Sequence, residues 1–143
     1  DVYKRQEIET HIKPQRKSEV GAERVSIRVR LKNREPRVDF ERLTQHVFAI
    51  ARHPYFSDQY RMLIKESDPV SLPSGGAYEF TTRTTSIETD SIPNGHLKFV
   101  DIGWRLLLKD HAGGILLTNS SWPVLREHSA DIEKVAEGSD FTL

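Results

Sequence analysis

The feature that most constrains the fold is a strict alternation of apolar and polar side chains in the segment RVSIRVRLK. The apolar positions are Val25, Ile27, Val29 and Leu31. A period of two residues is typical of a β-strand with one buried face. The segment therefore predicts a strand whose opposite face is polar. That polar face carries four basic side chains: Arg24, Arg28, Arg30 and Lys32.

These four basic residues are the candidate binding site, and we assign them to protein binding. Arginine and lysine side chains aligned on one side of a sheet could dock carboxylates or phosphates, although a solvated outer face is the simpler interpretation. The whole chain has 21 basic and 21 acidic residues, so no global field draws it to nucleic acid or to an anionic membrane. The composition therefore does not favour a polyanion as the partner. A cytoplasmic domain that binds nucleic acid or another anionic partner through the same face is the alternative.

The segment VDFERLTQHVFAIARHP predicts a helix from Asp39 to about Arg52. Aspartate is a good N-cap, and Pro54 would end the helix. Five apolar residues would share one helical stripe: Phe40, Leu43, Val47, Ile50 and Ala51. Alternation in the following QYRMLIK predicts a return strand, which completes a strand-helix-strand unit over residues 24–66.

The second half of the chain predicts β-structure. SDPVSLPSGGA contains two prolines and two glycines and is expected to be a loop. AYEFTTRTTSIETD, HLKFVDIGWRLLLKD and GILLTNSSWPVL then predict a three-stranded antiparallel meander, with DHAGG as a hairpin turn and with Val100 in its second strand. Ser129 would cap a short closing helix that runs through Val135, with Gly138 at its end. The expected fold class is α+β, with the helix packed on one face of a single sheet.

The ends of the chain are expected to lie outside this domain. DVYKRQ is the translation of GATGTGTATAAGAGACAG, which resembles the transposase recognition end used to fragment DNA for sequencing, so residues 1–6 are expected to be a library scar. Residues 7–23 are mostly polar and predict a flexible linker. A single domain would then occupy residues 24–137, and residues 138–143 would form a tail.

The sequence contains no motif that indicates catalysis, a cofactor or a metal. Cysteine is absent, PSGGA lacks the GK[ST] of a phosphate-binding loop, and no G-x-S-x-G occurs. On the expected helix, His46 and His53 would be about 10 Å apart along the axis, too far to share a zinc ion. We therefore predict a non-enzymatic protein. The longest apolar run, VFAIA, is far shorter than a membrane span.

Several segments together resemble the LpoB family of bacterial penicillin-binding-protein activators over about residues 25–126. VRLKNREPRVDFERLTQHVFAIARHPYF resembles the opening of that family, in which a strand, an Asn-containing turn, a helix and a second strand follow one another. The matching residues there are Asn33, Asp39, Leu43, Thr44 and Phe56. GAYEFTTRTTSI is similar to the Gly-Ala-x-Tyr strand of the family. The matching residues there are Gly76, Ala77, Tyr78, Arg83, Ser86 and Ile87. VDIGWRLLLKDHAGGILLTNSSW resembles the closing hairpin.

This resemblance implies a domain that faces the periplasm and is tethered to the outer membrane through a lipidated cysteine upstream of the segment seen here. Such a lipoprotein would dock on a peptidoglycan synthase, a penicillin-binding protein, and would stimulate it. The membrane would be reached through that anchor alone, and no cofactor is implied.

Overall fold

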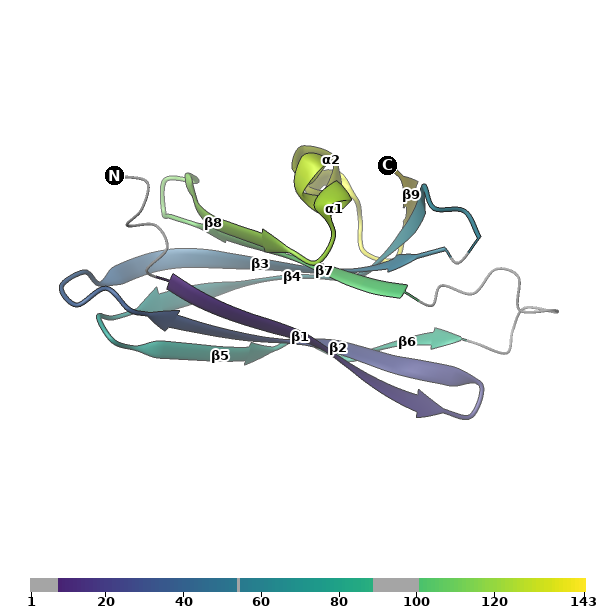
Figure 1. Cartoon of the computed structure of the whole chain (residues 1–143), viewed down its shortest axis with the longest axis horizontal. Helices are drawn as coiled ribbons and strands as arrows, with labels where there is room; N and C mark the ends of the chain where they lie inside the picture. Colours follow the sequence, from purple (N-terminus) through teal and green to yellow (C-terminus); the bar gives the residue numbers. More distant parts are fainter. Residues whose placement is uncertain (1–7, 54, 89–100) are drawn as a thin grey trace.

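The computed structural model describes residues 8–53, 55–88 and 101–143, which form a β-sandwich with two short helices on one side (Figure 1). Sheet A contains β1 (Ile8–Glu19), β2 (Ala22–Asn33), β5 (Ala77–Thr81) and β6 (Thr85–Glu88). Sheet B has the order β8 (Ile115–Ser120), β7 (Asp101–Lys109), β3 (Phe40–Arg52), β4 (Gln59–Leu72) and β9 (Asp140–Thr142). The helices α1 (Pro123–Glu127) and α2 (Ser129–Lys134) cover the outer side of sheet B.

Sheet A is organised around β2, which confirms the strand predicted from RVSIRVRLK. β1 pairs antiparallel with β2 along its whole length, and the two strands are joined by a tight turn in which Gly21 has φ of 75°. On its other side β2 pairs with β6 over residues 22–25 and with β5 over residues 28–32. Between these two strands the Thr82 hydroxyl accepts the backbone N–H of Ile27 at 2.9 Å, so the side chain continues the hydrogen bonding where the strand pairing stops.

The main hydrophobic core lies between the two sheets. It combines the apolar face of β2 with inward-facing residues of the central strands of sheet B, among them Leu43, Ile64, Leu106 and Leu108. A second cluster lies on the other side of sheet B, where Phe48, Ile50 and Met62 pack under the helices. Sheet B is therefore buried on both faces, whereas sheet A keeps one face in solvent.

The predicted helix over residues 39–52 is wrong, because these residues form the central strand β3. β3 pairs with β4 on one side and with β7 on the other. Its residues alternate between the two cores: Leu43, Val47, Ala49 and Ala51 face sheet A, and Phe48 and Ile50 face the helices. A strand buried on both faces is apolar at consecutive positions, and in VFAIA this continuity mimics a helical stripe. The α+β fold with a helix packed on a single sheet is therefore corrected to a mostly β sandwich.

Three further expectations are corrected. Residues 8–19 of the predicted linker form strand β1, and residues 140–142 of the predicted tail form β9, which pairs with β4. The three-stranded meander does not form, because β5 and β6 join sheet A while β7 and β8 join sheet B.

The prolines inside strands, Pro14 of β1 and Pro69 of β4, pair with a neighbour on one side, as expected for strand edges. Residues 1–6 and Val100 lie outside the described residues.

One local prediction is confirmed and a second is confirmed in part. β7 and β8 form the predicted hairpin, and Asp110 Oδ1 accepts the backbone N–H groups of Ala112 and Gly114 in its turn, both at 2.9 Å. The closing helix α2 begins at Ser129, but the serine does not cap it. Its hydroxyl accepts a hydrogen bond from Arg105 Nη2 instead, at 2.6 Å.

Candidate functional site

The four predicted binding residues lie together on the solvent-exposed outer face of sheet A. All four are on β2 and are exposed, while the residues that alternate with them are buried in the inter-sheet core. In the register of the β1–β2 pair, Lys13 lies opposite Arg28 and Lys17 lies opposite Arg24, so both lysines project from the same side. We call this surface the basic face. Its members are Lys13, Lys17, Arg24, Arg28, Arg30 and Lys32.

Sequence reasoning missed the two lysines of the basic face because it assigned residues 7–23 to a linker. A signal was present in the alternation of Ile8, Thr10 and Ile12, which is the inward-facing side of β1. The alternation ends after Ile12, where Pro14 and Arg16 take the inward positions.

Carboxylates neutralise only part of the basic face. Glu79 of β5 accepts a hydrogen bond from Arg28 Nε at 3.1 Å and lies 3.6 Å from Arg30 Nε, and the bond from Arg28 holds the pKa of Glu79 below its usual range. Arg24 lies 3.5 Å from Glu19. Lys13, Lys17 and Lys32 have no carboxylate within ion-pair distance among the residues that the structure describes. The face therefore retains a surplus of positive charge.

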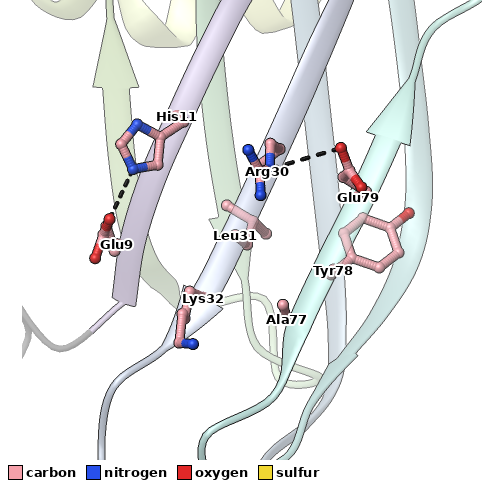
Figure 2. A pocket seen from close by; sticks show the side chains of 8 residues that line it. All are labelled: Glu9, His11, Arg30, Leu31, Lys32, Ala77, Tyr78 and Glu79. Carbon is pink, nitrogen blue, oxygen red and sulfur yellow. Dashed lines mark hydrogen bonds and ion pairs between the residues drawn. The ribbon is translucent and has the colours of Figure 1, made fainter.

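One end of the basic face is hollowed, as Figure 2 shows. The hollow measures about 300 Å³ and lies over two rows of paired residues. One row is Glu9, Lys32 and Ala77, and the other is His11, Arg30 and Glu79. Ala77 has the shortest side chain in either row, so the surface is lowest beside Lys32.

The carboxylate at the rim of the hollow is already engaged. Glu9 accepts a hydrogen bond from Arg34 Nε and lies 2.7 Å from His11 Nε2, and these contacts lower the pKa of Glu9 to about 2. Glu9 therefore remains charged over the physiological range, and its charge is balanced from outside the hollow by Arg34.

Tyr78 lies beneath the hollow and ties the two sheets together. Its hydroxyl donates a hydrogen bond to Asp68 Oδ2 on β4. Burial, and then the hydrogen bond to Asp68, raise the pKa of this phenol. The contact fixes β5 over sheet B and so positions Ala77 and Glu79 next to β2.

The two histidines considered as metal ligands have separate roles in the structure. His53 is buried at the end of β3, where its Nδ1 accepts the backbone N–H groups of Tyr55 and Phe56 at 3.1 and 3.2 Å. His46 lies within β3, and burial followed by the charges of Lys109 and Lys65 lowers its pKa. Within residues 8–53, 55–88 and 101–143, no group of three or more metal-ligating side chains is close enough together to hold an ion.

Arg105 is a buried residue that sequence reasoning did not single out. It is 2% exposed and lies under α2, where Nη2 donates to Ser129, while Nε and Nη1 have no hydrogen-bond partner among the residues that the structure describes. The nearby Glu133 is bonded to Lys109 Nζ at 2.8 Å. Burial lowers the pKa of Arg105, which shows that the site disfavours its charge.

We expect Arg105→Met to raise the free energy of unfolding by about 1 kcal/mol, because a flexible, unbranched apolar chain avoids burying an underbonded cation. Urea denaturation measures the change. Arg126→Met, at an exposed position of α1, is the matched control and should change stability by less than about 0.5 kcal/mol. A clear loss of stability in Arg105→Met would contradict the prediction.

No protein-family model and no curated protein matches this chain. The solved structures that share some similarity include two of β-glucuronidase from Bacteroides uniformis. One, β-glucuronidase 2 bound covalently to cyclophellitol-6-carboxylate aziridine, has a TM-score of 0.49, and the other has a TM-score of 0.45. Both are 16% identical over 78% of this chain, which spans 12% of each glucuronidase chain. A Northeast Structural Genomics Consortium target has a TM-score of 0.42 and 11% identity, over 84% of this chain and 90% of its own.

These similarities are too low to assign a family or an activity. No helix in the described part of the chain is long and apolar enough to span a membrane.

Proposed function

We propose that this β-sandwich is a non-catalytic binding domain that docks an acidic surface of a protein partner on the basic face of sheet A. The observation that carries the proposal is the alignment of six cations on one exposed sheet face, three of them without a carboxylate among the described residues. Opposite charges across an interface increase the association rate and fix the orientation of the partners.

The distribution of charge favours a protein over a polyanion. Glu79 of β5 contacts both Arg28 and Arg30 along one edge of the face, so a nucleic-acid backbone that lay over these arginines would also meet a carboxylate. The chain as a whole has no excess of basic residues. A protein surface can match such a mixed pattern residue by residue, whereas a uniform phosphate chain cannot.

The sequence resemblance narrows this proposal to a particular partner, a peptidoglycan synthase in the bacterial envelope, with the domain held in the periplasm by an upstream lipid anchor. Part of that resemblance depends on a helix over residues 39–52, but these residues form strand β3. The basic face is therefore the stronger support for a binding role. Binding to a purified penicillin-binding protein tests the narrower proposal. Failure of that binding would remove this partner without affecting the general role of the face.

Reversing charges on the basic face should weaken binding to an acidic partner. We expect the double variant Arg28→Glu and Arg30→Glu to bind a fluorescein-labelled hexaglutamate peptide at least tenfold more weakly, because two attractions become repulsions. Fluorescence anisotropy at low salt measures the affinity, with hexaglutamine as the uncharged reference peptide. Arg126→Glu is the matched control, since Arg126 is exposed on the helix side of sheet B.

A second pair of changes guards against misfolding of the first variant, in which new glutamates would crowd Glu79. Lys13→Glu and Lys17→Glu break none of the ion pairs of the face and should also weaken binding. Unchanged affinity in both variants would contradict the proposal. Strong retention on heparin that falls steeply with salt would support nucleic-acid binding instead.

A further inference from the structure

The hollow at the end of the basic face has the form of a socket for a single side chain. Its floor is low because Ala77 stands in the same row as Lys32, and its walls are the longer side chains of Lys32, Arg30 and Glu79 (Figure 2). A space of about 300 Å³ bounded in this way accommodates one or two side chains of an extended segment and not a folded surface. The shape therefore selects a protruding group.

The charges around the hollow define which group fits. Lys32 projects into it with no carboxylate partner among the described residues. Arg30 is held loosely, since Nε lies 3.6 Å from a Glu79 carboxylate that already accepts hydrogen bonds from Arg28. These two cations are neighbours on the same face of β2, two residues apart, and can contact the same anion from two sides.

The flanking carboxylates distinguish a carboxylate ligand from a phosphate. Glu9 and Glu79 stand at opposite ends of the hollow, and both are held in the charged form by arginines. A carboxylate has two oxygens, one for each of the two cations, whereas the further oxygens of a phosphate would face Glu9 or Glu79, which as carboxylates cannot donate a hydrogen bond to them. A singly charged carboxylate is therefore the better match.

We infer that the hollow is a carboxylate socket, in which Lys32 and Arg30 bind the side chain of an aspartate or glutamate from an extended acidic segment of the partner. This inference rests on the proposed function and adds to it one specific contact point. The remaining cations of the basic face attract the segment, whereas the socket sets the position at which it is held. Ala77 is part of the recognition because a larger residue there would fill the space beside Lys32.

Filling the socket without changing its charge tests the inference. We expect Ala77→Leu to weaken binding of the labelled hexaglutamate peptide at least fivefold in the anisotropy assay. Lys32→Gln, which keeps an unbranched polar side chain but removes its charge, should have a similar effect. Ala130→Leu is the matched control, since Ala130 is exposed on α2 on the far side of the sandwich, and it should bind as the unchanged protein does. Equal melting temperatures show that the variants are folded.

The outcomes of these measurements distinguish the carboxylate socket from the general binding role of the basic face. If Ala77→Leu binds normally while the double reversal at Arg28 and Arg30 binds weakly, the socket is wrong and the basic face stands. If the unchanged protein does not discriminate hexaglutamate from hexaglutamine, both fail. Displacement of the peptide by inorganic phosphate at concentrations where acetate has no effect would overturn the assignment to a carboxylate.

Discussion

Replacing Asn33 by alanine should lower the free energy of unfolding by about 2–4 kcal/mol, because one buried amide satisfies three backbone groups. Asn33 is fully buried at the end of β2. Its Nδ2 donates to the carbonyls of Val38 and Leu72 at 2.7 and 3.0 Å, and its Oδ1 accepts the N–H of Glu35 at 2.9 Å. These bonds join the strand that carries the basic face to the connection leading into sheet B. Alanine would leave all three backbone groups without this partner.

Urea denaturation followed by tryptophan fluorescence measures the loss. Asn33→Asp keeps the acceptor but loses both donors and buries a charge, so it should destabilise the protein at neutral pH at least as strongly as alanine. Asn119→Ala is the control, since that amide is exposed and donates a hydrogen bond to the Thr10 hydroxyl rather than to the backbone. A change below about 1 kcal/mol for Asn33→Ala would show that solvent replaces the lost bonds.

The parts of the fold that sequence predicted correctly are those whose signal is local. The side chains of β2 alternate between apolar and polar because one face of the strand packs against the core and the other is exposed to water. The β7–β8 hairpin could be predicted because Asp110 and the glycines that follow it form the turn within five residues. Neither prediction needs knowledge of what lies across the sheet.

The helix prediction failed because the environment of β3 depends on distant elements. Leu43, Val47 and Ile50 are compatible with a helical stripe, and Asp39 with an N-cap. What excludes the helix is the pairing of β3 with β4 and β7 and the burial of its second face by Leu125 and Ile132 of the two helices. That second apolar layer lies some 80 residues away in sequence.

Only part of the candidate site could be predicted, because the rest of it also depends on elements that are distant in sequence. Arg24, Arg28, Arg30 and Lys32 could be placed on one face from the alternation of β2 alone. Lys13 and Lys17 join them because their strand, β1, pairs with β2, and β1 is an edge strand with little apolar surface. The hollow depends on the pairing of Ala77 with Lys32 across two strands. These residues are 45 positions apart in sequence, so no local pattern predicts their pairing.

The second large effect is expected at Gly103, where a methyl group should lower the free energy of unfolding by about 1–3 kcal/mol. Gly103 is buried in β7 beneath the Trp122 ring. A Cβ atom there would lie 2.5 Å from Trp122 Cε3 and 2.6 Å from Cζ3. The ring cannot withdraw freely, because the Arg52 guanidinium lies 4.4 Å from its centroid and Tyr60 packs beside it. Gly103→Ala would therefore disturb the whole aromatic cluster under α1.

A double-mutant cycle separates this clash from a general effect of substituting a strand glycine. Trp122→Leu removes the ring that a methyl group at Gly103 would meet. In that background the cost of Gly103→Ala should largely disappear, giving a coupling of at least about 1 kcal/mol between the two positions. Alanine is otherwise preferred over glycine within a strand, so the residual effect could even be stabilising. Additive effects of the two substitutions would contradict this prediction. They would show that the packing of the Trp122 ring on the β7 backbone is not what requires glycine at position 103.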